Sequence, residues 1–466
     1  LFKKITKKCS KLKGDTYSLL KVNDLLNDIN NIALSKQYEF INASIEEKIN
    51  GDRINFDINI SESDKFYIEK INIKGNFNTL EEVVRNNLIV DEGDPFNEIL
   101  FNKSVNNIQS LGIFKKVKTD VRTGSNDSFK EIDIDVEERP TGEISLTAGF
   151  GTTGETIGAG IKENNFLGKG IRLNTNLELT AESIKGQFIY AKPNFNYSDN
   201  TLFTSVKSST SDFMTNSGYK TSEIGFSLGT EFEQFQNIFI SPEIDFLIED
   251  LETSDRASNI LKKQEGSYTD LYFNYSIDQD LRDKKFRTES GYFTTFSQEL
   301  PLVSDNAELS NAFIITNYKK LSTTSDMIGK ISFYGKTITG LSDDVRISKR
   351  LNIPSSRLRG FQRGKVGPVE NSDYIGGNHV SSLNFSATLP NIVEGLDNLD
   401  VGIFVDAANL WGVDYDSSID DKSTVRSSTG VALNLMTPIG PLSFSFANAL
   451  TKASTDKTET FRFNLG

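Results

Sequence analysis

The segment IRLNTNLEL (residues 171–179) alternates apolar and polar side chains along its length. Successive side chains of a β-strand point to opposite faces, so this period of two predicts a strand with one apolar face. The same pattern recurs in EIGFSLGTEF (223–232), LSFSFANAL (442–450) and FRFNLG (461–466). Helical periodicity is absent after Pro140, and we therefore predict that the remainder of the chain consists of consecutive strands.

Residues 140–466 favour a transmembrane β-barrel over a soluble β-sandwich or β-solenoid. Soluble sheets share the period of two, but they rarely continue this far without other elements. At about ten residues per strand and connections of similar length, the region predicts on the order of 16 antiparallel strands. An apolar content of 37%, with 33 Phe and 14 Tyr, suits strands that have a single apolar face. Runs of roughly 18–20 apolar residues, which a membrane helix needs, are absent, and this does not exclude a barrel.

Residues 65–139 mix helices and strands and predict one complete α+β domain. Its predicted order is strand–helix–helix–strand–strand, in the segments FYIEKINIKGN (66–76), TLEEVVRNNL (79–88), NEILFNKSVNNIQSLGIF (97–114), KKVKTDV (115–121) and KEIDIDVEE (130–138). Thr79 followed by Glu82 has the spacing of a capping box, which predicts that the first helix begins there. We expect the second helix to end near Gly112.

The N-terminal part of the chain carries some of the same elements and predicts a truncated copy of this domain. LLKVNDLLNDINNIAL (19–34) places apolar residues at helical spacing, and YEFINASIEEKI (38–49) and RINFDINI (53–60) predict two strands. The organisation that we expect has three parts: a truncated domain in 1–64, a complete domain in 65–139 and the barrel in 140–466.

Motifs for catalysis, metal binding and nucleic-acid binding are missing from the sequence. His379 is the only histidine and Cys9 the only cysteine, which excludes a histidine metal cluster and an intramolecular disulfide. The GKIS…GKT sequence of residues 329–337 lacks the glycine and the following helix of a phosphate-binding loop. A net charge of −13 argues against a general nucleic-acid binder. We therefore expect no enzymatic activity, no metal, no other cofactor and no nucleic-acid partner.

One segment, RLRGFQRGKVGPVENSDYIGGN (357–378), differs from the strands around it. It is rich in Gly and Arg and poor in aliphatic residues, yet it lies between the predicted strands GKISFYGKTITG (329–340) and VSSLNFSATLP (380–390). A solvated loop does not require the arginine–glycine–aromatic sequence of residues 359–361. We therefore expect a specific contact for this loop, with a merely exposed loop arginine as the alternative.

Seven short motifs follow one another in a characteristic order: GDPFNEILFNKSVNNIQSLGIFKKV (93–117), VEERPTGEISLTAGFG (136–151), NNFLGKG (164–170), RGF (359–361), GGN (376–378), FVDAANLWG (404–412) and TPIGPLSFSFANAL (437–450). In this order and spacing they resemble the BamA family, the central outer-membrane component of the bacterial β-barrel assembly machinery. The resemblance covers essentially the whole chain. It implies the last two POTRA domains in the periplasm, followed by a transmembrane barrel in the outer membrane of a Gram-negative bacterium.

The resemblance also implies what the arginine–glycine–aromatic loop does. In this family the loop folds back into the barrel lumen and docks on the inner wall. Gly360 permits close approach of the backbone, Phe361 supplies a wedge, and Arg359 brings a planar charged fork suited to carboxylates and aromatic faces. The expected partners of Arg359 are Phe404 and Asp406, which share one face of a predicted strand.

For function, the resemblance implies insertion of other β-barrels through a weak seam between the first strand (about 143–151) and the last (about 458–466). The seam residues of the first strand are Gly149, Phe150 and Gly151, and the C-terminal strand signal comprises Phe461, Phe463, Leu465 and Gly466. Glycines weaken strand pairing, so we expect fewer backbone hydrogen bonds here than between other neighbours. Thr147 is expected to face a position near Arg462.

The partners implied by the resemblance are unfolded outer-membrane proteins, accessory outer-membrane lipoproteins that bind the POTRA domains, and the lipid bilayer. The alternative is a two-partner-type protein secretion pore of the same superfamily. Three features depart from the family pattern. Asn384 stands where a second acidic partner of the loop is usual, Arg287 stands where a proline is common, and the chain ends at Gly466 before the expected terminal aromatic.

Overall fold

The computed structural model describes residues 41–50, 53–62, 66–151, 154–235, 237–283, 288–322, 327–390, 399–437 and 440–465, and positions 6, 10, 14, 25, 28 and 29. The chain divides into two compact units. The first comprises Leu1–Gly142 with Lys162–Arg172, and the second comprises Glu143–Ile161 with Leu173–Gly466.

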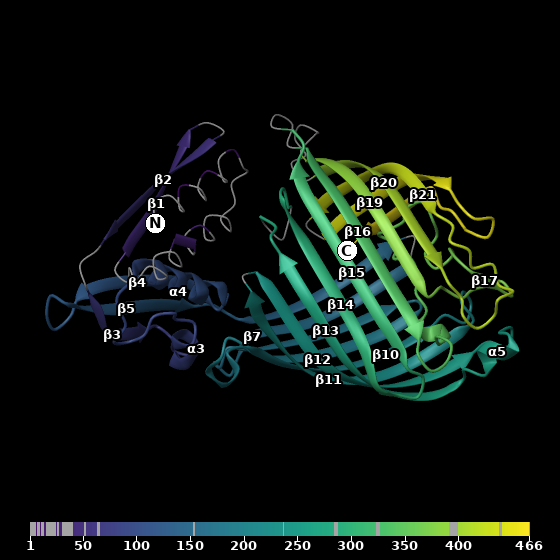
Figure 1. The fold of residues 1–466 in the computed structure, drawn as a ribbon, viewed down its shortest axis with the longest axis horizontal. Coiled ribbons are helices and arrows are strands. Elements are labelled where there is room, and N and C mark those ends of the chain that lie inside the picture. The colour runs from purple at the N-terminus through teal and green to yellow at the C-terminus, as the bar shows by residue number, and fades with distance from the viewer. Residues whose placement is uncertain are drawn as a thin grey trace. The chain divides into compact units, whose positions relative to one another are not determined.

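The first unit contains a three-stranded sheet covered by two helices (Figure 1). In chain order its elements are β3 (Tyr67–Lys74), α3 (Glu81–Arg85), α4 (Glu98–Ser110), β4 (Phe114–Thr123) and β5 (Phe129–Glu138). The sheet order is β3-β5-β4, with β5 parallel to β3 and antiparallel to β4. Apolar side chains of the sheet and of both helices share one buried core that includes Val84, Ile108, Ile132 and Ile134. The predicted order of strands and helices is confirmed.

The predicted capping box of α3 is wrong. The helix begins at Glu81, and the residue that precedes it, Leu80, makes no side-chain cap hydrogen bond. The Glu138 carboxylate instead accepts hydrogen bonds from the backbone N–H groups of Thr79 (2.6 Å) and Asn78 (3.1 Å). Burial raises the pKa of Glu138, but these donated hydrogen bonds outweigh it and hold the pKa below its usual range. In a capping box the Glu82 carboxylate would accept the Thr79 N–H, and the Glu138 carboxylate of β5 takes this donor instead.

Two further strands, β1 (Ile41–Asn50) and β2 (Arg53–Glu62), pair in antiparallel register as a hairpin. They agree with the two strands predicted near residues 38–60. Most of the predicted helix at 19–34 lies outside the described residues, although Leu25 and Ile29 are helical and buried. Cys9 also lies outside them. The proposed boundary between domains at residue 64 therefore stays a prediction.

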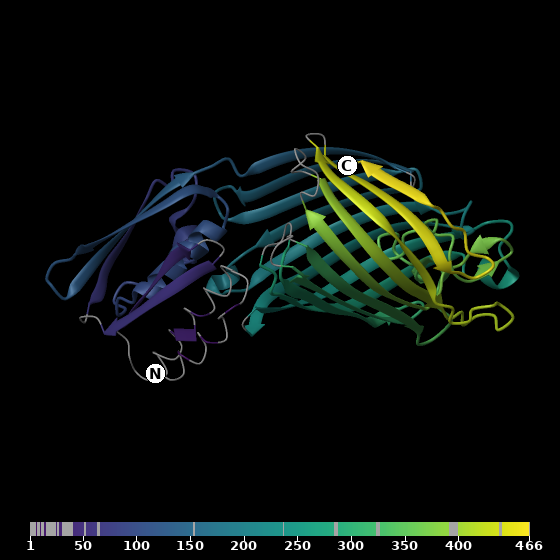
Figure 2. The same ribbon diagram turned by 90° about the horizontal axis from the view of Figure 1, so that it is seen from above.

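Sixteen strands form a closed barrel, drawn from blue to yellow in Figures 1 and 2. The strands are β6 (Gly142–Gly151), β7 (Gly154–Phe166), β8 (Ile171–Thr180), β9 (Ser183–Lys192), β10 (Thr201–Asp212), β11 (Tyr219–Phe235), β12 (Ile238–Thr253), β13 (Gly266–Asp280), β14 (Gly291–Ser304), β15 (Glu308–Lys320), β16 (Ile328–Gly340), β19 (His379–Pro390), β20 (Leu399–Trp411), β21 (Arg426–Thr437), β22 (Gly440–Thr451) and β23 (Phe461–Leu465). The barrel and its number of strands confirm the prediction from the period of two.

The two faces of the barrel wall differ in the way that the alternation predicts. On β11, Ile224, Phe226 and Leu228 are exposed by 48–61%, whereas Ser227 between them is 2% exposed. On β22 the outward Phe446 is 50% exposed and the neighbouring Ala447 is buried. An apolar outer face with small and polar residues inside is the arrangement of a barrel surrounded by lipid.

The helices are short. None among the described residues is long and apolar enough to cross a membrane.

Candidate functional site

The long segment 341–378 connects β16 to β19 and is here called the lumen loop. It contains β17 (Val369–Glu370) and β18 (Asp373–Tyr374), which pair with each other. Its side chains and carbonyls contact residues of β12, β13, β15, β20 and β23. Strands from such different parts of a closed wall are within reach of one loop only from the interior, so the loop lies inside the barrel.

The structure brings Arg359 and Asp406 together on the inner wall. The guanidinium donates from Nε to Oδ2 (2.7 Å) and from Nη2 to Oδ1 (2.8 Å), and the backbone N–H of Arg359 donates to Oδ2 (3.1 Å). This bidentate geometry is the strongest form of an arginine–carboxylate pair. The guanidinium also lies 3.4 Å from the centroid of the Phe404 ring. Phe404 and Asp406 share the inner face of β20 because they are two residues apart.

Asn384 donates a further hydrogen bond to this buried carboxylate. Its Nδ2 donates to Asp406 Oδ1 (2.8 Å) and to the backbone carbonyl of Arg357 (2.7 Å). Asn384 is directly opposite Asp406 in the pairing of β19 with β20. An amide donor at this position adds no second negative charge, so the Asp406 carboxylate is the acidic partner of Arg359.

Gly360 and Phe361 fit closely against the wall. Gly360 has a φ of +85°, and an added Cβ would lie 3.1 Å from Ala447 Cβ and 3.3 Å from Ser428 Cβ. Phe361 is 2% exposed and belongs to a buried apolar cluster with Leu358, Val366 and other residues of the loop and wall. The backbone therefore approaches β21 and β22 where only glycine leaves room, and the Phe361 ring fills the space beside it.

We expect Gly360→Ala to destabilise the barrel by about 3 kcal/mol. The alanine would adopt an unfavourable positive φ, and its Cβ would crowd the barrel wall, which would have to shift. Gly364→Ala is the matched control, since Gly364 has a φ of +66° but no atom lies within 4 Å of an added Cβ. It should lose only about 1 kcal/mol. Urea unfolding of both variants in detergent measures the difference, and equal losses would contradict the close approach.

We expect Arg359→Ala to lower the free energy of unfolding by about 3 kcal/mol, because it leaves the fully buried Asp406 carboxylate without its cation. Asp406→Ala should add little in the double variant, with a coupling of roughly 1–3 kcal/mol. Arg363→Ala serves as the control, since Arg363 is an exposed arginine of the same loop. Fully additive losses in urea unfolding would show that the two side chains act independently.

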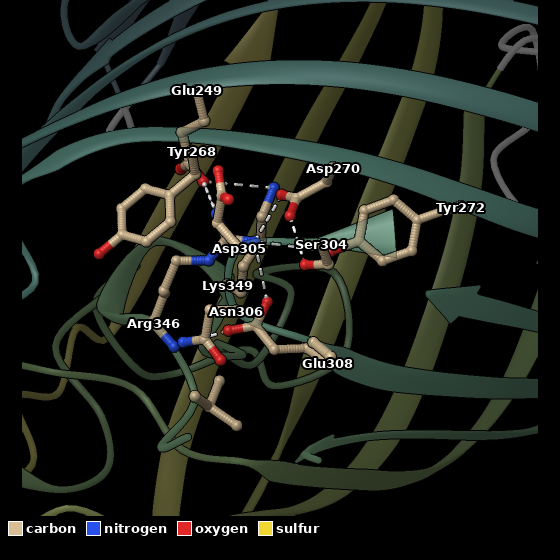
Figure 3. Close-up of polar contacts among 12 residues, drawn as sticks. Glu249, Tyr268, Asp270, Tyr272, Ser304, Asp305, Asn306, Glu308, Arg346 and Lys349 are labelled. Atoms are coloured by element: carbon tan, nitrogen blue, oxygen red, sulfur yellow. Dashed lines mark hydrogen bonds and ion pairs between the residues drawn. The ribbon is translucent and has the colours of Figure 1, made fainter. Parts of the chain in front are cut away.

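A second basic anchor of the lumen loop has no counterpart among the predicted site residues. Arg346 is fully buried, and Figure 3 shows three carboxylates around it. The guanidinium lies 3.1 Å from Glu249 Oε2 on β12, 2.6 Å from Asp270 Oδ2 on β13 and 3.3 Å from Glu308 Oε2 on β15. The backbone N–H of Arg346 also donates to Glu308 Oε1 (2.7 Å). One side chain thus ties the start of the loop to three strands.

Lys349 adds a second cation to this cluster, within 3.3 Å of Glu223 Oε1 and 3.6 Å of Glu249 Oε2. The signal for the cluster was present in the sequence. VRISKR (345–350) is a basic run, and the acidic residues Glu249, Asp270 and Glu308 lie at buried, inward positions of their strands. Their convergence could not be predicted because it depends on how the barrel closes.

The described contact between the first and last strands is short. Among the described residues, β23 pairs with β22 at five positions and with β6 at two, Asn464 opposite Gly151 and Leu465 opposite Phe150. Residues 152, 153 and 466, which flank these pairs, lie outside the described part of the chain. By comparison, β14 and β15 pair at nine positions. Antiparallel register from these pairs places Thr147 beyond the end of β23, so the predicted contact of Thr147 with a position near Arg462 is wrong. Gly149 lies on β6 near this contact.

The other residues of the predicted C-terminal signal are placed as follows. Phe461 is 41% exposed and its ring lies 5.0 Å from that of Phe446, and 6.1 Å from that of Phe463. Leu465 ends β23. Gly466 and Arg287 lie outside the described residues.

The residues that could suggest metal binding, histidine chemistry or phosphate binding lie in the following surroundings. Within the described part of the chain, no cluster of three or more His, Cys, Asp or Glu side chains could hold a metal ion. His379 packs against the ring of Trp411, with the centroids 5.5 Å apart. Residues 329–337 form part of β16, so they make no phosphate-binding loop.

Comparison with known proteins gives two family matches. The Omp85 superfamily domain matches residues 165–466, and the POTRA family, described as a surface antigen variable number repeat, matches residues 66–139. Among curated proteins, the outer membrane protein assembly factor BamA of Neisseria meningitidis is 24% identical over 97% of this chain and 63% of its own length. BamA of Neorickettsia risticii is 24% identical over 89% of this chain and 56% of its own length. The chain thus spans less than two thirds of these relatives.

Solved structures give the same fold. BamA from Haemophilus ducreyi lacking POTRA domains 1–3 has a TM-score of 0.72 at 21% identity, covering 97% of this chain and 94% of that one. CdiB from Acinetobacter baumannii has a TM-score of 0.56 at 13% identity, covering 100% of this chain and 86% of that one. The Omp85 match alone covers well over half of the residues. The chain therefore belongs to the Omp85 superfamily, as a Gram-negative outer-membrane barrel with its POTRA region in the periplasm.

Proposed function

We propose that this protein folds and inserts β-barrel proteins into the outer membrane, and that the seam between β6 and β23 is where substrate strands enter. The observation that carries the proposal is the pairing of these strands, which covers two positions within the described residues. Backbone N–H and C=O groups that are unpaired within a bilayer are strongly unfavourable. They are also a template for another strand. An incoming strand can therefore form new backbone hydrogen bonds where the existing strands leave such groups unpaired.

The POTRA region is proposed to receive substrates and the accessory lipoproteins. In its sheet order β3-β5-β4, the strands β3 and β4 are edges, and a sheet edge can bind an extended segment by adding a strand. The names of the curated relatives, outer membrane protein assembly factors, support this assignment. In this scheme Arg359, Gly360 and Phe361 hold the lumen loop on the inner wall while a substrate strand enters between β6 and β23.

A protein secretion pore is the second candidate, because CdiB proteins share the fold. The two functions make different demands on the molecule. A pore must clear a path through the lumen, where the loop is anchored by Arg346 and Arg359. Assembly through a seam needs no such path, and this favours the assembly function.

Depletion of the full-length protein in its own cells tests the proposal. We expect the levels of several unrelated outer-membrane barrels to fall together, with unfolded forms accumulating in the periplasm. Expression of the wild-type protein from a plasmid should restore them. Unchanged barrel levels, with a single secreted protein retained in the periplasm, would identify a secretion pore instead.

A further inference from the structure

The last strand carries a buried arginine that points to the lumen loop. Arg462 of β23 is 7% exposed. Its Nη1 donates to the backbone carbonyl of Ser355 (2.8 Å) and its Nη2 to that of Phe361 (2.6 Å). Glu459 forms an ion pair with the same guanidinium. Both carbonyls belong to the lumen loop, so the charged group of the last strand is satisfied largely by the loop.

The backbone just before β23 pairs with the loop as well. Phe361 and Thr458 form an antiparallel bridge. Hydrogen bonds join Gln362 N to Lys457 O (3.0 Å), Lys457 N to Lys365 O (3.0 Å) and Glu459 N to Gly360 O (3.1 Å). The loop therefore acts as a short partner strand for the chain that leads into β23.

These contacts distribute the restraints on β23 unevenly. Within the described part of the chain, it pairs with β22 at five positions on one side and with β6 at two on the other. From the interior it is held by two donated hydrogen bonds of Arg462 and by three backbone hydrogen bonds of the preceding segment. The loop is itself fixed to distant strands, through Arg346 on β12, β13 and β15 and through Arg359 on β20.

We propose that Arg462 is a positioning residue that fastens the last strand to the lumen loop, so that β23 keeps its place when the seam opens and β6 is the strand that moves away. This inference rests on the proposed use of the seam. A bidentate grip on two carbonyls needs the arginine fork, and a shorter neutral side chain cannot reproduce it. The last strand would then present a fixed edge to an incoming strand.

The first test compares Arg462→Gln with Arg363→Gln, an exposed arginine of the same loop, in full-length protein in lipid nanodiscs. Hydrogen–deuterium exchange at the amides of Gln362, Lys457 and Glu459 should accelerate about tenfold or more in Arg462→Gln. The reason is that this variant loses the charged hydrogen bonds that keep the segment before β23 paired with the lumen loop. Exchange in Arg363→Gln should remain that of the wild type. Exchange in β22 should be unchanged in both, which shows that the barrel is folded. Unchanged exchange at the three amides of Arg462→Gln would overturn the proposal.

A second variant replaces the lost contact by a covalent one. Gln362 and Lys457 are opposite each other next to the Phe361–Thr458 bridge, and opposite residues of an antiparallel pair are within disulfide range. The variant carries Gln362→Cys and Lys457→Cys with Arg462→Gln, and Cys9→Ser removes the native thiol. We expect oxidation to return both the slow exchange and the assembly of an unrelated outer-membrane barrel to wild-type levels, and reduction to abolish both.

The readouts separate this inference from the proposed function. Fast exchange that oxidation reverses, together with assembly that follows it, supports the fastening of β23 and its use. The same exchange with assembly unaffected in every state supports the contact and overturns the use of the seam. Impaired assembly that the disulfide fails to rescue, although exchange has recovered, overturns the positioning role of Arg462.

Discussion

A disulfide between Gly151→Cys and Asn464→Cys is expected to abolish assembly activity, in proportion to the fraction of protein that is cross-linked. These positions are opposite each other in the pairing of β6 with β23, and such pairs are close enough for a disulfide. If substrate strands enter between β6 and β23, the covalent bond removes the only motion that admits them. Reduction should restore activity fully. Folding of an unrelated outer-membrane barrel in liposomes that contain the full-length protein measures the effect.

The control places a disulfide between two neighbouring strands that pair along their whole length. Ile224 and Ile248 are opposite each other on β11 and β12, on the outer face, in a pairing that extends along both strands. Ile224→Cys with Ile248→Cys should form a disulfide without altering assembly. Full activity of the oxidised Gly151–Asn464 variant, with cross-linking demonstrated on a gel, would exclude entry at the seam and leave the POTRA region as the working surface.

Arg346→Met is expected to be the most destabilising single substitution in the lumen loop, with a loss of roughly 5 kcal/mol. Methionine preserves much of the side-chain volume, so the effect reports charge. The carboxylates of Glu249, Asp270 and Glu308 would remain buried and close together, with Lys349 as the nearest remaining cation. The temperature at which the folded barrel loses its compact gel mobility should fall markedly, and less folded protein should reach the membrane.

Neutralising the carboxylates tests this cause. Glu249→Gln, Asp270→Asn and Glu308→Gln, combined with Arg346→Met, should recover much of the lost stability, because replacing a whole buried ionic cluster by neutral groups is far less unfavourable than breaking it. Lys349→Met is the comparison, since the Lys349 side chain is 19% exposed and its shortest ion pair is 3.3 Å, against 2.6 Å for Arg346. It should lose less than Arg346→Met. A quadruple variant no more stable than Arg346→Met alone would assign the loss to packing rather than to charge.

The sequence by itself determined the order of strands and helices in residues 65–139, the barrel that follows them and the approximate number of its strands. These features follow from short-range periodicity, because a strand with one lipid-facing side must alternate and a helix cannot. The partnership of Arg359 with Asp406 was also accessible, since the motif resembles a known family and Phe404 and Asp406 share a face two residues apart. The predicted capping box failed for a reason that is not local: the Thr79 N–H donates to Glu138, 59 residues away in the sequence.

Only the tertiary structure decided which charged groups meet in the lumen and which residues of β6 and β23 are opposite each other. Arg346 is 97 residues from Glu249 and 76 from Asp270, and Arg462 is 101 residues from the Phe361 carbonyl. No periodicity relates such positions. Their contact depends on the order in which the strands close into a barrel and on the path of one loop through its interior. A shift of one residue in register would turn each inward carboxylate toward lipid, so closure itself selects the partners.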